Sequence, residues 1–158
     1  MAGDILSKYG TSGQTLTISM AGVVANAGRE STAVDNSSNK FVDAYLVVKI
    51  KTGGSGTSST GMVAIYAYGS TDGGTTYSGN ATGTDGALTP ANMVQIGSIA
   101  VSANSTEYKS AVLSVGSAFA GGLPERWGIA ILNLTGATLD ATGSNFFAKW
   151  QGIAAQYT

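Results

Sequence analysis

The sequence predicts an all-β protein, an antiparallel β-sandwich or jelly roll of about eight strands. Apolar residues recur at every second position in several segments, which is the period of a strand with one buried face. Clusters of Gly, Asn, Asp and Ser separate these segments and indicate turns. Helical apolar stripes do not exceed two turns anywhere in the chain. A closed up-and-down barrel is the alternative architecture.

Seven segments show this alternation, and we expect each to form a strand: residues 15–20, 41–50, 62–68, 94–99, 110–115, 129–132 and 146–151. The last of them runs on towards Tyr157. Residues 129–132 are apolar at every position, which predicts a strand buried on both faces. The Gly-rich residues 53–56 between the second and third segments predict a hairpin. The longest loop is expected over residues 69–92.

The chain has 158 residues, which is the size of one domain. We expect a flexible or extended N-terminal arm over residues 1–13 and a single β-sandwich domain over 14–158. The first ten residues lack the basic and apolar regions of a signal peptide. The most apolar run, residues 41–50, is too short to span a membrane. We therefore expect no export signal and no membrane partner.

Charged residues make up 11% of the chain, with 8 Lys and Arg against 9 Asp and Glu. This sparse and balanced charge argues against nucleic-acid binding. The chain has no His and no Cys, which removes imidazole and thiolate groups from catalysis and metal binding. The few carboxylates select no glycosidase pair. We expect a protein that is not an enzyme and that holds no cofactor or metal.

Low charge and many small side chains fit a surface that other subunits partly cover, although some β-domains are simply low in charge. Asp72 and Asp85 lie in the long loop, but a Ca²⁺ site needs about six to eight oxygen ligands. An Asx-turn at Asp72 is the simpler interpretation. Whether the two carboxylates meet in space stays open.

Five aromatic residues could form a contact surface or stack on a sugar, because such rings bind well where one side is apolar and the other wet. They are Tyr66, Tyr68, Tyr77, Trp127 and Trp150. The alternatives are that the tyrosines cover a sheet face, that the tryptophans fill the core, or that the rings anchor a subunit contact.

Four distinctive stretches are YGSTDGGTTY at 68–77, GGLPERWGI at 121–129, NLTGATLDA at 133–141 and FAKWQGI at 147–153. Together they resemble a type of small β-protein common in tailed-bacteriophage genomes. The resemblance covers roughly residues 60–158, and the order of the motifs is more specific than any one of them.

The resemblance implies a virion component, either a capsid decoration (cement) protein or part of a fibre, that forms a β-sandwich and a homotrimer. It implies other copies, the major capsid protein or other virion proteins as partners, and assembly in the host bacterial cytoplasm. It supplies no catalytic residues. The chain is short for a receptor-binding fibre, which favours decoration of the head. The alternative is a carbohydrate-binding module or a fibre component that binds a glycan through exposed aromatic rings. If the protein decorates the head, the arm at residues 1–13 would reach onto neighbouring subunits.

Overall fold

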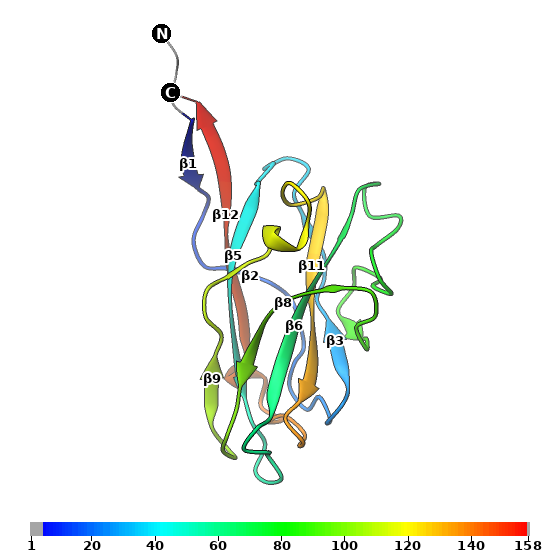
Figure 1. Ribbon diagram of the computed structural model, residues 1–158, viewed down its shortest axis with the longest axis vertical. Coiled ribbons are helices and arrows are strands. Elements are labelled where there is room, and N and C mark those ends of the chain that lie inside the picture. Colours follow the sequence, from blue (N-terminus) through cyan, green and yellow to red (C-terminus); the bar gives the residue numbers. More distant parts are fainter. Residues whose placement is uncertain (1–4, 158) are drawn as a thin grey trace.

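The computed structural model describes residues 5–157 and consists of two antiparallel sheets packed face to face (Figure 1). Sheet A contains β1 (Ile5–Tyr9), β2 (Gln14–Thr15), β5 (Asp43–Lys51), β9 (Glu107–Lys109), β10 (Leu113–Ser114) and β12 (Phe147–Tyr157). Sheet B contains β3 (Gly28–Glu30), β4 (Val34–Asp35), β6 (Met62–Ser70), β7 (Gly86–Ala87), β8 (Val94–Ala100) and β11 (Arg126–Leu134). Two short 3-10 helices, η1 (Gly116–Ala118) and η2 (Gly143–Asn145), lie in connections.

The strand order is that of a jelly roll. Three long strands each pair along one edge with two short strands that follow one another in the chain: β12 with β1 and β2, β5 with β9 and β10, and β11 with β3 and β4. If each couple counts as one interrupted strand, sheet A has the order β1/β2, β12, β5, β9/β10. Sheet B has the order β3/β4, β11, β6, β8, with β7 added beside β3. The predicted sandwich of about eight strands is thus confirmed.

Alternate side chains of the long strands build the core between the sheets. Leu46, Val48 and Ile50 of β5 are fully buried and face residues of β6 and β11 such as Ile65 and Ile129. The rings of Trp127 on β11 and Trp150 on β12 meet edge to face, with centroids 5.1 Å apart. Such a pair contributes about 0.5–1.5 kcal/mol beyond its buried area. The two tryptophans therefore join the two sheets directly.

Five of the expected strands are confirmed as β5, β6, β8, β11 and β12. In the segment 15–20 only the start is a strand, yet Leu16 and Met20 are buried as the alternation predicts. In the segment 110–115 only β10 forms. The hairpin predicted at residues 53–56 is wrong, because β5 lies in sheet A and β6 in sheet B. Turn residues reverse the chain here, but they do not decide whether the flanking strands pair with each other.

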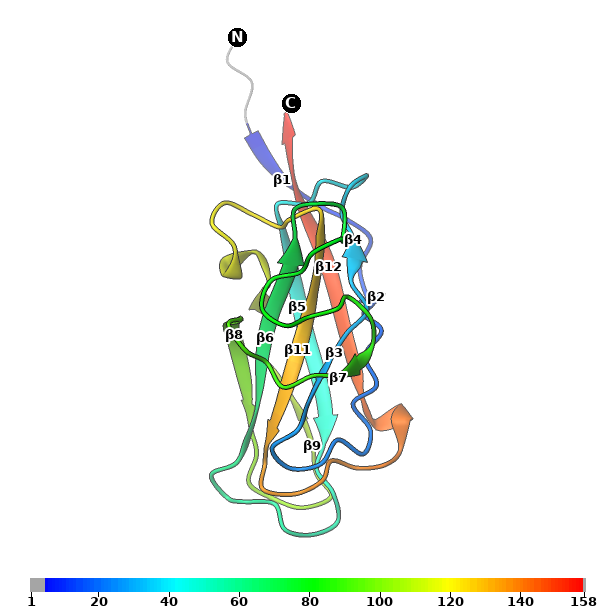
Figure 2. The same ribbon diagram turned by 90° about the vertical axis from the view of Figure 1, so that its right-hand side faces the viewer.

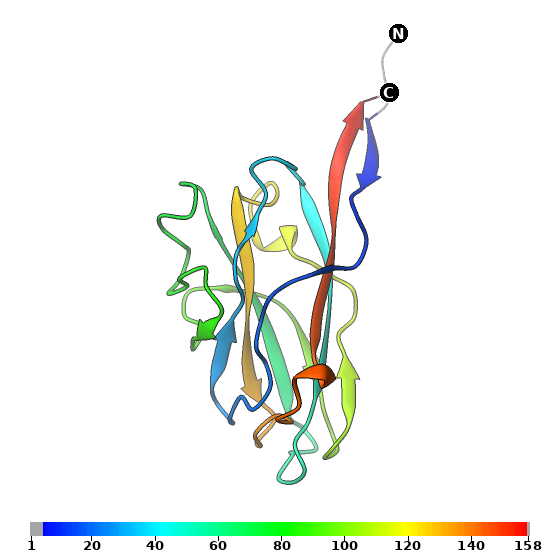
Figure 3. The same cartoon turned by 180° about the vertical axis from the view of Figure 1, so that it is seen from behind.

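β1 lies within the residues expected to form an arm, while residues 1–4 of that arm lie outside the described range. It pairs antiparallel with the end of β12, from Ile5 opposite Tyr157 to Tyr9 opposite Ile153. We call residues 5–9 and 153–157 the terminal ribbon. Figures 2 and 3 show that this ribbon projects beyond the sandwich, and in Figure 3 it leans away from sheet B.

The long loop between β6 and β8 lies across the outer face of sheet B (Figure 2). It includes β7, which pairs with β3 through Arg29 opposite Ala87 and Glu30 opposite Gly86. Residues 71–93, between the two flanking strands, are called the covering loop. One sheet face is thus covered by the protein's own chain.

Candidate functional site

The five aromatic residues expected to form a platform do not share an exposed face. Trp127 and Tyr68 are fully buried, and Trp150 is only 8% exposed. Tyr66 and Tyr77 are half-buried. The three buried rings cannot stack on a sugar, so this part of the expectation is corrected. Their apolar area is used to fill the core and to hold the covering loop.

Tyr68 shows how the covering loop is held. It lies on the outer side of β6, its hydroxyl donates a hydrogen bond to the Ser31 carbonyl, and its ring meets that of Tyr77 edge to face at 5.6 Å. Burial raises the pKa of the Tyr68 hydroxyl. The ring also lies over Gly128, where a Cβ would collide with it. Glycine at this position therefore makes room for the tyrosine.

A buried carboxylate completes this attachment. Glu30 on β3 is 1% exposed and accepts hydrogen bonds from Thr82 N at 2.9 Å, Thr82 Oγ1 at 2.7 Å and Gly83 N at 3.2 Å. A buried charge is costly unless hydrogen bonds replace its lost water. The burial of the Glu30 carboxylate therefore depends on the hydrogen bonds from residues 82–83, and the position of these residues depends on Glu30.

Asp72 and Asp85 serve separate local contacts. The Asp72 carboxylate accepts hydrogen bonds from Ser70 Oγ at 2.6 Å and Thr76 N at 2.9 Å, and these bonds lower its pKa to about 2. The carboxylate thus bonds the backbone of its own loop, at residues three and four positions on, whereas the expected Asx-turn would bond the residue two positions on.

The Asp85 carboxylate instead bonds Arg29 Nε at 2.6 Å and Ser19 N at 3.1 Å. Burial raises the pKa of Asp85, but its hydrogen bonds to Arg29 and Ser19 outweigh burial and lower it. Within residues 5–157, no three His, Cys, Asp or Glu side chains gather in a group able to hold a metal ion.

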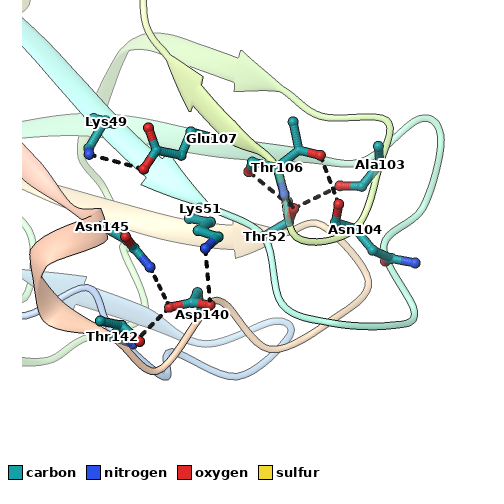
Figure 4. Close-up of polar contacts among 10 residues, drawn as sticks. All are labelled: Lys49, Lys51, Thr52, Ala103, Asn104, Thr106, Glu107, Asp140, Thr142 and Asn145. Carbon is teal, nitrogen blue, oxygen red and sulfur yellow. Dashed lines mark hydrogen bonds and ion pairs between the residues drawn. The ribbon is translucent and has the colours of Figure 1, made fainter.

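The end of sheet A away from the terminal ribbon is closed by its own polar contacts (Figure 4). Lys49 Nζ lies 3.3 Å from Glu107 Oε1, and Lys51 Nζ lies 3.9 Å from Asp140 Oδ2. Asp140 also accepts hydrogen bonds from Thr142 N and Asn145 Nδ2, both at 2.8 Å. These side chains therefore bond one another within the protein.

The terminal ribbon has the opposite character, and it is the candidate site. All five side chains of β1 are exposed. Large apolar side chains are exposed on β1 and beside its base, with Ile5 at 64% and Tyr9 at 58%. Together with them, Leu6, Val42 and Tyr45 form the group of exposed apolar residues at this end. The rings of Tyr9 and Tyr45 lie 6.5 Å apart.

The ribbon also has two open edges. Among the described residues, β1 pairs only with β12. β5 ends opposite Ile153, so β12 extends past it for residues 154–157. A two-stranded ribbon alone is marginally stable, and an exposed apolar edge strand is a template for pairing with another chain. The site is therefore suited to pairing with another protein chain.

Sequence reasoning missed this site because it selected aromatic residues by type. The segment Ile5–Tyr9 shows no alternation of apolar and polar residues, so its sequence predicts part of an arm and not a strand. The exposure of its side chains follows from the projection of the ribbon, which depends on how far β12 extends beyond β5.

Comparison with protein families, with curated proteins and with solved structures finds no match to this chain. In the part of the chain that the structure describes, no helix has both the length and the apolar character needed to cross a membrane.

Proposed function

We propose that this protein is a non-enzymatic structural protein of a tailed-phage virion, a capsid decoration or cement protein that binds the head shell and stabilises it. The observation that carries the proposal is the terminal ribbon, which presents exposed apolar side chains and two open edges beyond the sandwich. Edge strands of this kind bind proteins by main-chain hydrogen bonds, with alternate side chains adding specificity. The order of the motifs in residues 60–158 supports the phage assignment.

The architecture also supports the proposal, since jelly rolls are used in viral capsid domains. Glu30, Asp72 and Asp85 accept hydrogen bonds that hold the fold, which is a structural use of carboxylates. The proposed partners are further copies of the chain, in the homotrimer that the resemblance implies, and the major capsid protein or another virion protein. The proposed location is the virion, after assembly in the bacterial cytoplasm.

The first test is composition. Phage particles are purified on a density gradient from a bacterium that carries this gene in a phage or prophage, and their proteins are quantified by mass spectrometry. The expected result is this chain in a constant ratio to the major capsid protein. Its absence from particles whose other structural proteins are detected overturns the proposal.

The second test addresses the ribbon. Particles that lack the protein are mixed with purified wild-type chain or with the triple variant Ile5→Ser, Leu6→Ser, Tyr9→Ser. Wild-type chain should bind and raise the temperature at which the particles release DNA, and the variant should bind at least about tenfold more weakly, which is about 1.4 kcal/mol. The matched control is Val112→Ser, since Val112 is also 64% exposed but lies away from the ribbon. Equal binding of the triple variant and wild type removes the ribbon as the contact.

One observation favours the alternative of a carbohydrate-binding module or receptor-binding fibre component. Tyr9 and Tyr45 are 58% and 41% exposed and lie side by side, so they could stack on a sugar. The test is a glycan array probed with wild type and Tyr45→Ala. Binding that Tyr45→Ala abolishes would support this alternative. Tryptophan fluorescence is a poor probe here, because Trp127 and Trp150 lie in the core.

A further inference from the structure

We infer that two copies of this chain pair through the free edges of their β1 strands, antiparallel, with Ser7 of one copy opposite Ser7 of the second copy. The inference rests on the proposed role of the terminal ribbon as a contact surface, and it names the partner of the β1 edge as a second copy of the chain. The capsid is not needed for it.

The hydrogen bonds at the base of the ribbon show which backbone groups face the open edge. Gly10 N donates to Gly152 O at 2.8 Å, so Gly10 faces β12. Val42 N donates to Ile153 O at 2.7 Å, so Ile153 faces β5 and its neighbour Tyr9 bonds nothing on β12. Successive residues of an antiparallel strand alternate in this respect. The N–H and C=O groups of Ile5, Ser7 and Tyr9 therefore point away from β12.

The residues of β1 are complementary to themselves in one register. With Ser7 at the centre, Ile5 stands opposite Tyr9 of the second copy, and Leu6 opposite Lys8 of the second copy. Of the antiparallel registers that align outward-facing groups, this one pairs all five residues of β1. An aromatic residue opposite a β-branched one is a favourable cross-strand pair, and Lys8, the single charged residue of β1, meets Leu6 instead of a like charge.

The position of the ribbon leaves room for the second copy. β1 and the end of β12 stand clear of the sandwich in all three ribbon views (Figures 1–3), so the body of the second copy lies beyond the tip. The pairing is two-fold symmetric and closes on itself, so it is a contact separate from the one that would build the proposed homotrimer. It joins two marginal two-stranded ribbons into one four-stranded sheet, and a sheet with an apolar face needs about three or more strands to be stable by itself.

The test uses a single thiol, because the chain contains no cysteine. Opposite residues in a hydrogen-bonded antiparallel pair have Cα atoms about 5.5 Å apart, within the range of about 4.4–6.8 Å that a disulfide spans. Ser7→Cys should therefore give a covalent dimer under mild oxidation, reversible by reductant. The control is Lys8→Cys, also at an exposed position of β1 but opposite Leu6 of the second copy, which should cross-link at least about tenfold more slowly. Equal rates for the two variants overturn the inference.

A second variant tests the same edge without a cross-link. Proline is tolerated where the N–H of an edge strand faces solvent, and the Ser7 N–H faces the open edge. Ser7→Pro should keep the circular dichroism spectrum of the wild type and weaken dimerisation in sedimentation equilibrium by at least about tenfold, or about 1.4 kcal/mol. Undiminished dimerisation by Ser7→Pro, or a wild-type chain that stays monomeric at millimolar concentration, contradicts the pairing.

The outcomes separate this inference from the proposed function. If the chain is found in phage particles but gives no Ser7 cross-link, the β1 pairing is wrong and the virion role stands. If the chain cross-links through Ser7 but is absent from particles, the pairing stands and the virion role is wrong.

Discussion

The outer faces of the two sheets differ in what covers them. The outer face of sheet B is covered by residues 71–93, which are held by the buried side chains of Glu30 and Tyr68. Among residues 5–157, sheet A has no such cover, and its outer face continues through Tyr45 onto the exposed terminal ribbon. The chain therefore covers one sheet by itself and leaves the other open, where we expect a second molecule to bind.

Removing the ring beneath the covering loop should destabilise the protein more than any other change considered below. Tyr68→Ala should lower the free energy of unfolding by about 3–5 kcal/mol, because it empties a fully buried site. Tyr68→Phe removes only the hydrogen bond to Ser31 and should cost about 1 kcal/mol. Urea denaturation of the three proteins measures both values. A loss below about 1 kcal/mol for Tyr68→Ala would mean that the loop does not close over this face.

The next effect concerns the carboxylate that holds the loop. Glu30→Ala should cost about 2–3 kcal/mol, because it leaves the amides of Thr82 and Gly83 without an acceptor. Hydrogen exchange of those two amides should speed up more than exchange in β5. The control is Glu107→Ala, whose side chain is half exposed, and it should cost less than about 0.5 kcal/mol. Equal effects of the two variants would contradict the attachment.

Acid should loosen the covering loop at Asp72. Its pKa is lowered from 3.8 to about 2 by hydrogen bonds from Ser70 and Thr76, so the unfolded chain binds the proton more tightly than the folded chain. The stability that Asp72 contributes is complete above 3.8 and is lost as the pH falls through about 2. The difference in unfolding midpoint between wild type and Asp72→Asn should therefore shrink over this interval. A difference that is constant with pH would contradict the lowered pKa.

The smallest effect is a gain in stability from a substitution on sheet A. Lys49 and Lys109 stand opposite each other on β5 and β9, and like charges in such a pair are unfavourable. Lys109→Glu should raise the free energy of unfolding by about 0.2–1 kcal/mol, and salt should reduce the gain. The control Lys8→Glu, which lies opposite Ala154 on the terminal ribbon, should give no gain. Thermal unfolding at low and high salt distinguishes the two.

The sequence predicted those parts of the fold in which a local pattern states which face is buried. Burial alternates strictly along β5, and residues 129–132 of β11 are apolar at every position, so these strands and their core positions follow from the local pattern alone. β3 carries no such pattern, because the burial of Glu30 depends on Thr82, far away in the chain. The connection at residues 53–56 has hairpin residues but joins two sheets. The burial of Glu30 and the connection at residues 53–56 both depend on which distant segments pair with each other. Local residue types do not indicate this pairing.

The candidate site was predictable only in part for a related reason. Aromatic type marked Tyr66, Tyr68, Tyr77, Trp127 and Trp150, but a ring that fills a core and a ring that meets a partner look alike in a sequence. The exposed set on the ribbon, which includes Ile5 and Tyr9, is defined by the length of β12 relative to β5. That length difference is a property of strand pairing.

β12 belongs to both the sandwich and the ribbon, and this has a mechanical consequence. The strand runs from Phe147 to Tyr157 without a break, with Trp150 packed in the core and the last residues paired with β1. Its hydrogen bonds to β5, β2 and β1 lie across the direction of the strand. A pull on the ribbon along that direction therefore loads these bonds together in shear instead of opening them one at a time. A force applied at the tip is thus shared by the whole row of hydrogen bonds along β12 and by the contact between Trp127 and Trp150.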